Sequence, residues 1–352
     1  MKPEMNKDIP VLLLAWYDAH ARVLPWRKKN DPYRIWVSEI MLQQTRAETV
    51  LPYYEKFIGE LPDIRALAAA PEERVFKLWQ GLGYYRRARN MQLAAKIVAE
   101  TLGGILPSTA EELKKLPGIG EYTAGAIASI AFNRRTSAVD GNVLRIVARL
   151  YGIADSIEDR TVASQIRDIV TGLLPDTRVG DFNQALMDLG ATVCLPNGEP
   201  LCKECPLAEF CEAHNRNLIS VLPKRSDRPQ RPRQDHTVLI LECQGRFALQ
   251  KRPENVLLAS LWQFPMLQGA SDFGGCKKAL PFLTDDAVLS VAPIPSHRHI
   301  FSHLQWDLAG YFIRLKEIPC DAPYIWAAAE DIRKNYSVPS AFKPYMKIIT
   351  GE

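Results

Sequence analysis

Residues 116–125 read LPGIGEYTAG, and this stretch decides the fold of the region around it. Pro117 cannot continue the helix that precedes it, and Gly118 and Gly120 permit backbone angles that are closed to other residues. Small and apolar residues then recur at helical spacing over residues 122–132. The stretch therefore predicts a tight hairpin between two helices.

Such a hairpin offers a site for an anion. The second helix begins with backbone N–H groups that have no partner within the helix. Glycines without side chains allow a phosphate to approach these groups closely. A helix-hairpin-helix element can hold a nucleic-acid strand in this way without reading its sequence. Because Gly-x-Gly turns also join ordinary helices, the hairpin alone indicates either function with equal weight.

The composition is that of a soluble globular protein with two domains, or three. The 352 residues are 47% hydrophobic, which is enough for a large buried core. A formal net charge of +4 is only mildly basic, so local clusters of charge must recognise any anionic partner. The two basic clusters are Arg86, Arg87 and Arg89 beside two tyrosines, and Lys224, Arg225, Arg228, Arg231 and Arg233 among prolines.

The chain carries no membrane or export signal. No apolar run approaches the roughly 20 residues that a membrane-spanning helix requires. The N-terminus lacks the pattern of a signal peptide. Seven cysteines without an export signal favour a reducing compartment, where clustered cysteines hold metal more often than disulfides. We therefore expect a cytoplasmic protein that makes no contact with membranes.

The periodicity of the chain changes once. Helical patterns run almost without interruption from Asp8, the expected cap of the first helix, to Ala213. Strand patterns follow later, over residues 237–243, 247–250, 261–267 and 306–315. These patterns predict a mainly α domain over residues 1–217, a basic, proline-rich linker over 218–235 and a small α+β domain over 236–352.

Four cysteines form a C-x7-C-x2-C-x5-C array at the end of the helical region. They are Cys194, Cys202, Cys205 and Cys211. Four thiolates in one short segment can hold one compact metal centre. Zinc knuckles usually pair close-spaced cysteines at both ends, whereas this array contains a single C-x2-C. The spacing favours a cubane iron–sulfur cluster, with structural zinc as the alternative.

Two carboxylates are candidates for acid–base chemistry. Glu39 stands among apolar residues, and a buried acid that stays protonated near neutral pH can donate a proton. The alternative is an amphipathic helix on which Glu39 faces water. Asp140 precedes an apolar helix, so it can cap that helix or face a developing positive charge as an anion. Cleavage of a glycosidic bond uses such a pair, one acid and one anion.

Taken in order, the motifs form a specific set. They are LPWR (24–27), WVSEIMLQQT (36–45), QGLGYYRRARN (80–90), LPGIGEYTAG, VDGN (139–142), FNQALMDLGATVC (182–194), the cysteine array and FSHLQW (301–306). This set resembles the MutY-type adenine DNA glycosylases, within the endonuclease III-like helix-hairpin-helix superfamily. The resemblance covers essentially the whole chain.

The resemblance implies a helix-hairpin-helix DNA glycosylase domain with an iron–sulfur cluster loop, and a C-terminal α+β domain of the Nudix or MutT type. The implied activity removes adenine mispaired with 8-oxoguanine or guanine from duplex DNA, after the base leaves the stack. It also implies a [4Fe-4S] cluster, a monovalent cation at the hairpin and a monomer on DNA. Residues 236–352 contain no Nudix-type run of Arg and paired Glu, so this domain is expected to bind and not to hydrolyse.

The resemblance assigns the chemistry to four residues. Glu39 would protonate a ring nitrogen of adenine and help to activate water. Asp140 would stabilise the oxocarbenium-like sugar, with Tyr122 and Asn142 in support. Seven residues separate the first two cysteines where the family has six, and a Pro-Asn-Gly turn at 196–198 can absorb the additional residue.

Further residues are implied to bind the DNA. They are Trp26, Arg27 and Gln184 in the adenine pocket, Arg22 near the abasic sugar, Leu42, Gln44, Thr45 and Tyr84 at the opened stack, Gly118 and Gly120 on the phosphate backbone, and Phe301, Ser302 and His303 at the 8-oxoguanine. Some members of the family carry Glu in place of Gln184.

Two other functions stay open. A bifunctional glycosylase with lyase activity, as in endonuclease III, needs a lysine nucleophile. In that group the lysine stands at the hairpin position of Tyr122, and a phenol cannot form a Schiff base. The other function is a non-catalytic iron–sulfur protein that binds DNA, in which Glu39 could be replaced without consequence.

Overall fold

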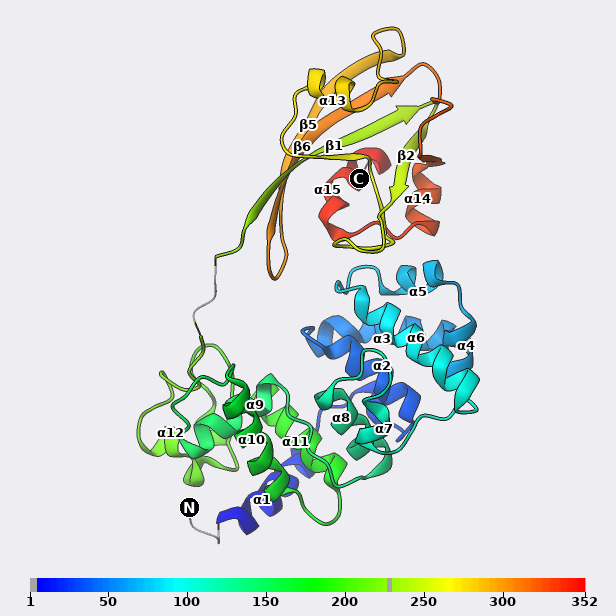
Figure 1. Ribbon diagram of the computed structural model, residues 1–352. Coiled ribbons are helices and arrows are strands. Elements are labelled where there is room, and N and C mark those ends of the chain that lie inside the picture. The colour runs from blue at the N-terminus through cyan, green and yellow to red at the C-terminus, as the bar shows by residue number, and fades with distance from the viewer. Residues whose placement is uncertain (1–4, 227–229, 352) are drawn as a thin grey trace. The chain divides into compact units, whose positions relative to one another are not determined.

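The computed structural model describes residues 5–226 and 230–351 (Figure 1). The chain divides into two compact units, Met1–Ala70 with Arg89–Asp227, and Pro71–Ala88 with Arg228–Glu352. We refer to them as the helical unit and the sheet unit. Of the basic cluster expected in the linker, Arg228 lies outside the described residues.

The described part of the helical unit is built from helices. They are α1 (Met5–His20), η1 (Pro25–Arg27), α2 (Pro32–Leu42), α3 (Ala47–Glu60), α4 (Ile64–Ala69), α6 (Arg86–Thr101, whose first turn belongs to the sheet unit), α7 (Ala110–Leu113), α8 (Glu121–Phe132), α9 (Gly141–Tyr151), α10 (Arg160–Leu173), α11 (Val179–Thr192), η2 (Cys202–Glu204), η3 (Ala208–Phe210) and α12 (Glu212–Asn215). The predicted helical class is confirmed. Within the described residues, no helix combines the length and the apolar character needed to cross a membrane.

Polar caps set where the functional helices begin. Asp31 accepts hydrogen bonds from the N–H groups of Tyr33, at 2.9 Å, and Arg34, at 3.2 Å, and Pro32 opens α2 as expected. The expectation that Asp8 caps the first helix is wrong, because α1 begins at Met5 and Asp8 lies in its first turn. An acid in the first turn still interacts favourably with the helix dipole.

Helix α11 lies at the centre of the helical unit, against α1, α8 and α9. Most of its residues are buried, including the polar Asn183, Gln184 and Asp188. A buried polar group is costly unless it is hydrogen-bonded. The side-chain amide of Asn183 donates hydrogen bonds to Ser129 Oγ at 2.9 Å and to the Thr136 carbonyl at 3.0 Å. The buried polar residues of α11 therefore need hydrogen-bond partners from other parts of the fold.

The sheet unit is a mixed sheet with helices. Its elements are α5 (Glu72–Trp79), β1 (Arg233–Cys243), β2 (Arg246–Lys251), β3 (Trp262–Gln263), β4 (Met266–Gln268), α13 (Phe273–Ala279), β5 (Val288–Ile300), β6 (Gln305–Leu315), β7 (Ile325–Ala328), α14 (Ala329–Asn335), η4 (Ser340–Phe342) and α15 (Lys343–Thr350). The strand order is β3-β2-β1-β6-β5, with β4 paired to β1 and β7 paired to β2. Strands β1 and β6 are parallel, and the other pairs are antiparallel.

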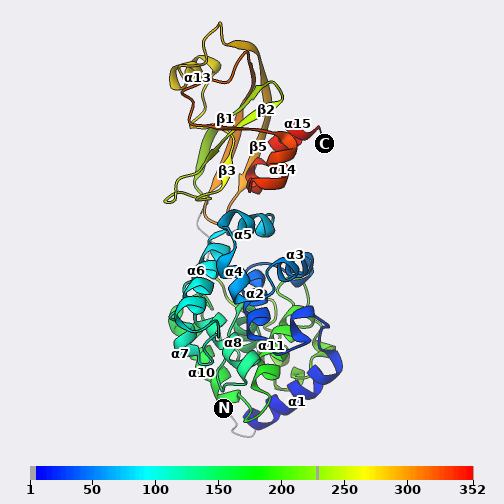
Figure 2. The same cartoon turned by 90° about the vertical axis from the view of Figure 1, so that its right-hand side faces the viewer.

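Both faces of the sheet are covered. Along β1, Val238 and Ile240 pack with residues of α14 and α15, whereas Leu239 and Leu241 pack with Cys276 of α13. Figure 2 shows α13 apart from α14 and α15, which lie on the opposite side of the strands. This alternation is the period of two that a strand imposes on its side chains. The predicted α+β class is confirmed.

The strand predictions miss β5 and β7, merge β3 and β4 into one strand over residues 261–267, and start β1 too late. Strand β5 was not expected, because its Pro293 and Pro295 and its polar C-terminal half obscure the pattern; as the last strand in the order, it lies at the edge of the sheet, where proline is tolerated. Strand β1 already begins at Arg233, inside the predicted linker. Residues 71–88 have their contacts in the sheet unit, and the three predicted domains stay a prediction.

Candidate active site

Glu39 is a buried carboxylic acid near the end of α2. Its side chain lies in the run of buried residues from Tyr33 to Met41, and the residue is 4% exposed. The alternative in which Glu39 faces water is therefore excluded. The Tyr122 hydroxyl donates a hydrogen bond of 2.6 Å to Glu39 Oε2. Burial raises the pKa of Glu39 to about 7, the bond from Tyr122 lowers it, and the charge of Asp140 raises it.

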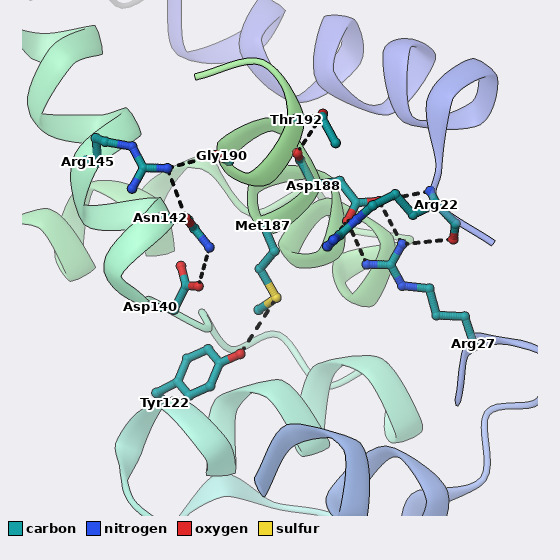
Figure 3. A network of polar contacts seen from close by, with 10 residues as sticks. All are labelled: Arg22, Arg27, Tyr122, Asp140, Asn142, Arg145, Met187, Asp188, Gly190 and Thr192. Atoms are coloured by element: carbon teal, nitrogen blue, oxygen red, sulfur yellow. Dashed lines mark hydrogen bonds and ion pairs between the residues drawn. The ribbon is translucent and has the colours of Figure 1, made fainter. Parts of the chain in front are cut away.

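Asp140 is the N-cap of α9, and both of its oxygens are engaged. Oδ1 accepts the N–H of Val143 at 2.8 Å. Oδ2 accepts the side-chain amide of Asn142 at 2.9 Å (Figure 3). Burial raises the pKa of Asp140, while these hydrogen bonds oppose the rise by favouring the anion. The carboxylate is therefore oriented by its own helix, in the manner expected of a cap.

Arg145 fixes Asn142 in turn. Its Nη2 lies 2.9 Å from Asn142 Oδ1 and 2.7 Å from the carbonyl oxygen of Gly190 on α11 (Figure 3). Gly190 is required here, because an added Cβ would stand 2.5 Å from Cβ of Asn142. The close approach of α9 and α11 thus sets the position of the amide that holds Asp140.

Asp188 is a fully buried carboxylate that two arginines share. Arg27 donates from Nη1 to Oδ2 at 2.7 Å and from Nη2 to Oδ1 at 2.9 Å, a bidentate pair. Arg22 adds its Nε at 2.7 Å from Oδ1 and its backbone N–H at 3.1 Å from Oδ2 (Figure 3). Burial alone raises the pKa of Asp188, but these arginines bring it below its ordinary value. Asp188 therefore holds two predicted DNA-binding residues in place.

One face of α11 lies between the Tyr122–Glu39 pair and the cluster of Asp188 with its two arginines. Gln184, Met187 and Asp188 are spaced by three and four residues, so they lie on the same side of the helix. Met187 Sδ lies 3.8 Å from the Tyr122 hydroxyl, and Figure 3 shows this side chain between Tyr122 and Asp188. The charge of Arg27 lowers the pKa of Glu39, which indicates that the pocket residues and the acid act on one another.

The last predicted pocket residue, Trp26, is buried in η1 and meets the ring of Tyr54 edge-on at 5.1 Å. Contacts within the helical unit join Glu39 to Tyr122, Asp140 to Asn142, and Asp188 to Arg22 and Arg27. Trp26 is buried in η1 beside Arg27, and Gln184 is buried on α11.

The two hairpin glycines differ in what they require. Gly118 has a φ of 78°, and a Cβ there would lie 2.7 Å from Cβ of Asn90. Gly120, the N-cap of α8, is extended with φ −85° and ψ −179°, and a Cβ there would meet nothing within 4 Å. The expectation of special backbone angles is correct for Gly118 and wrong for Gly120. The helix before the hairpin, α7, ends at Leu113.

The residues expected at the opened stack occupy two loops. Leu42 ends α2, Gln44 is exposed, and the N–H of Thr45 donates to the Leu42 carbonyl at 3.1 Å. Tyr84 is 49% exposed in the sheet unit. Gln44, with φ of 58°, and Tyr84, with φ of 48°, both adopt the left-handed region that residues other than glycine rarely enter.

The four clustered cysteines line one small cavity with Arg149, whose Nη1 lies 3.3 Å from Cys194 Sγ. Burial raises the pKa of the Cys205 thiol to about 12. Among the described residues, no three His, Cys, Asp or Glu side chains converge closely enough for a single metal ion. The assignment of these four cysteines to an iron–sulfur cluster or to structural zinc stays a prediction.

Residues 301–303 form the turn between β5 and β6. The N–H of Phe301 donates to the Leu304 carbonyl at 2.8 Å, and its ring packs edge-on against Trp306 at 4.9 Å. Ser302 and His303 are exposed. The turn therefore has an anchored aromatic residue and two exposed polar side chains, whose Ser302 Oγ and His303 Nδ1 lie 3.4 Å apart.

Comparison with known proteins identifies both parts of the chain. The model of the HhH-GPD superfamily of base excision DNA repair proteins matches residues 37–171, and the model of the NUDIX domain matches residues 236–347. The adenine DNA glycosylase of Rattus norvegicus is 36% identical, with 96% of this chain and 77% of the relative aligned. The human adenine DNA glycosylase is 34% identical, with 97% and 73% aligned.

The chain belongs to the adenine DNA glycosylase family. The adenine DNA glycosylase of Buchnera aphidicola subsp. Baizongia pistaciae is 39% identical, with 74% of each chain aligned. A solved thermostable thymine-DNA glycosylase superimposes with a TM-score of 0.55 at 28% identity, covering 60% of this chain and 98% of its own. Membership of the adenine DNA glycosylase family makes the chain a DNA glycosylase, a hydrolase of base excision repair.

Three residues of this adenine DNA glycosylase family member were missed in the sequence. Asp188 and Met187 stand inside the motif FNQALMDLGATVC without an assigned role, and Arg145 stands in an apolar helix. A signal existed for two of them, because a charged residue within an apolar helical pattern needs a buried partner. The identity of that partner depends on contacts between helices, such as Arg145 with Gly190, which sequence spacing does not contain.

Proposed function

We propose that the chain removes adenine mispaired with 8-oxoguanine or with guanine from duplex DNA, by hydrolysis of the N-glycosidic bond. Its relatives are named adenine DNA glycosylases, which supports adenine as the base released. The observation that carries the proposal is the buried acid Glu39, held by Tyr122 and paired with a second carboxylate, Asp140, across the same site.

In this proposal Glu39 is the general acid. With a pKa of about 7, a substantial fraction of its side chain is protonated at neutral pH and can donate to a ring nitrogen of adenine. Tyr122 engages Oε2, and within the described residues no hydrogen bond to Oε1 is found, so Oε1 can face the substrate. After the base departs, the carboxylate can accept a proton from the attacking water.

Asp140 stabilises the sugar in the transition state. Loss of the base leaves positive charge on the sugar ring, and a fixed anion lowers the energy of that state. The hydrogen bonds from Val143 and Asn142 favour the anionic form, and the developing positive charge would favour it further. Because the carboxylate is already oriented, little reorganisation is needed during the reaction.

Arg27 and Asp188 support the pocket for the flipped adenine. We propose that the ion pair between them holds Arg27 beside the base, with Trp26 and Gln184 as the other walls and Arg22 toward the sugar. An adenine is reached only after it leaves the stack. Leu42, Gln44, Thr45 and Tyr84 would fill the space it leaves, with Gly118 and Gly120 holding the phosphate backbone.

The chain is proposed to act as a monomer in the cytoplasm, on DNA that carries 8-oxoguanine. Ser302 and His303, exposed at their turn beside the anchored Phe301, would contact the damaged base. The three domains expected from the sequence, 1–217, 218–235 and 236–352, are kept as a proposal. The basic residues between the domains would add phosphate contacts, which weaken with salt.

We further propose that Cys194, Cys202, Cys205 and Cys211 hold a [4Fe-4S] cluster. Their shared cavity supports this assignment. When bound, such a cluster would cross-link residues 194–211 through the four thiolates, and no catalytic step is assigned to it. Its thiols must lose protons when iron binds. The monovalent cation at the hairpin remains an expectation of the family resemblance.

The decisive experiment measures adenine release and DNA binding in parallel. We expect Glu39→Gln to abolish single-turnover release from an 8-oxoguanine:adenine duplex while affinity in a gel-shift titration stays nearly intact. Glu55→Gln, an exposed glutamate on α3, is the control and should release adenine at the wild-type rate. Undiminished release by Glu39→Gln would falsify the catalytic assignment.

The mispair partner is tested separately. We expect faster release opposite 8-oxoguanine than opposite guanine, and a smaller ratio of the two rates when Ser302 and His303 are both changed to Ala. An unchanged ratio in this variant would remove the turn 301–303 from the recognition of the lesion.

A further inference from the structure

Helix α5 is attached to the sheet through Glu73. The carboxylate lies 2.7 Å from Nζ of Lys251 at the end of β2. Both of its oxygens also lie 3.2 Å from the indole N–H of Trp262 on β3. Trp262 is itself fixed, because its backbone N–H donates to the Ser337 carbonyl at 3.1 Å. Glu73 therefore meets two donors on a rigid part of the sheet unit.

Lys77 of α5 and Gln80, the residue that follows the helix, repeat this attachment. Lys77 Nζ donates to the Tyr336 carbonyl at 3.1 Å, and Gln80 Nε2 donates to the Val338 carbonyl at 2.9 Å. Residues 73 and 77 are four positions apart on α5, so they lie on the same face of the helix. Three polar contacts thus join residues that stand about 180 to 260 positions apart in the sequence, and none of them belongs to the catalytic pocket.

The loop after α5 is held by its own side chains. The indole N–H of Trp79 donates to the Gly83 carbonyl at 3.0 Å. Arg87 Nη2 lies 3.1 Å from the Leu82 carbonyl and 3.2 Å from the Gly83 carbonyl, and its guanidinium stands over the Tyr84 ring at 5.6 Å. A tyrosine at positive φ persists only where its surroundings fix it. Tyr84 is therefore a half-exposed ring on a rigid support.

The same unit carries the turn 301–303. Arg252, next to Lys251, stands over the Trp306 ring at 5.3 Å, and Trp306 packs against Phe301. The support of the Tyr84 loop and the support of the turn thus meet in one packed core.

We infer that Glu73, Lys77 and Gln80 are positioning residues that fix the Tyr84 loop to the unit that contacts 8-oxoguanine. Insertion of Tyr84 into the base stack and recognition of the lesion then occur as one event, because both groups move together. This inference rests on the proposed function of Tyr84 and of the turn 301–303. It assigns base extrusion, in part, to a helix that touches neither the adenine nor the lesion.

A charge exchange tests the inference. The probe is a duplex with 2-aminopurine in place of adenine opposite 8-oxoguanine, and its fluorescence rises when the base leaves the stack. At saturating protein we expect Glu73→Lys and Lys251→Glu each to slow this rise about fivefold, the scale of one partly exposed ion pair with its hydrogen bonds. The double variant restores the pair and should recover most of the loss. Glu55→Lys on α3 is the charge-matched control and should behave as wild type.

Hydrogen exchange separates this inference from the proposed function. In Glu73→Lys the amides of residues 81–87 should exchange faster than in wild type, while those of α8 should not change, whether or not adenine is released. If wild type releases no adenine but the exchange result holds, the proposed function fails and the attachment stands. Wild-type exchange and wild-type extrusion in Glu73→Lys, or a double variant slower than either single variant, would overturn the inference.

Discussion

The Tyr122 hydroxyl donates a hydrogen bond of 2.6 Å to Oε2 of Glu39. The bond joins the first turn of α8, at the hairpin, to the last turns of α2. It holds one oxygen of the acid and so orients the carboxyl group. The hairpin motif therefore has two uses, since its glycines offer a backbone surface for phosphate and its tyrosine sets the geometry of the acid.

The pH dependence of adenine release should report Glu39. Because the acid must be protonated, the single-turnover rate should fall as pH rises through about 7, the pKa of this residue. The bond from Tyr122 lowers that pKa, so Tyr122→Phe should move the midpoint of the fall to higher pH. The measurement is the rate from pH 5 to 9 for both proteins. A midpoint that moves to lower pH in Tyr122→Phe would contradict this role of the phenol.

Ionisation of the buried Glu39 should lower the free energy of unfolding at high pH. Its pKa is about 7 in the folded chain and 4.5 ordinarily, so the folded state binds the proton more tightly. The stability from this group is full below pH 4.5 and is lost as pH rises through about 7. Glu39→Gln should therefore unfold at a higher temperature than wild type at pH 8, by up to about 3 kcal/mol in free energy, and show no such gain at pH 4. An equal difference at both pH values would show that burial does not shift this group.

Asp188→Asn should strongly destabilise the helical unit. Removing one partner of a buried ion pair leaves the other charge unpaired and costs about 3–5 kcal/mol. Here the abandoned groups are Arg27, with a side chain 14% exposed, and Arg22. Asp18→Asn is the control, because Asp18 pairs with Arg178 at the surface, where water screens the charges, and its loss should cost far less stability. Urea unfolding of both variants decides it, and equal losses would contradict the assigned role of Asp188.

Gly190→Ala should impair release without touching DNA. The added methyl group would stand 2.5 Å from Cβ of Asn142, so Asn142 must move and Asp140 loses its amide donor. We expect a fall in the single-turnover rate of at least about tenfold, the worth of one well-placed hydrogen bond to a charged group. Gly172→Ala on α10, where a Cβ meets nothing within 4 Å, should leave the rate unchanged. A normal rate in Gly190→Ala would show that Asn142 does not position Asp140.

The four clustered cysteines predict the iron and sulfide content of the purified protein. Purified protein should be brown, with iron and acid-labile sulfide, and Cys205→Ser should lose the colour because one thiolate is missing. Arg149 Nη1 lies 3.3 Å from Cys194 Sγ. The substitution Arg149→Met removes this contact and should weaken the retention of iron. Metal analysis and the visible absorbance of the three proteins are the measurements. A colourless, fully active wild type with stoichiometric zinc would contradict the cluster.

Much of the architecture could be predicted from local signals. Asp31 and Pro32 mark the start of α2, a continuous apolar run marks β1, and the order of the motifs identifies the family. These signals depend on residues that are neighbours in sequence, where propensity and periodicity act. Strand β5 escaped prediction because its prolines are tolerated only at the edge of a sheet, and its place in the sheet is a tertiary property.

The sequence by itself determined which residue types are available to the site, including the acid Glu39, the phenol in place of a lysine at Tyr122 and four clustered cysteines. Only the tertiary structure decided that Glu39 is buried and titrates near neutral pH, since burial depends on how α2 packs. It also decided that Arg22 and Arg27 both bind Asp188, and that α5 packs as part of the sheet unit. The reason is physical: a pKa, an ion pair and a docking contact are set by distances in space, which the order of residues does not contain.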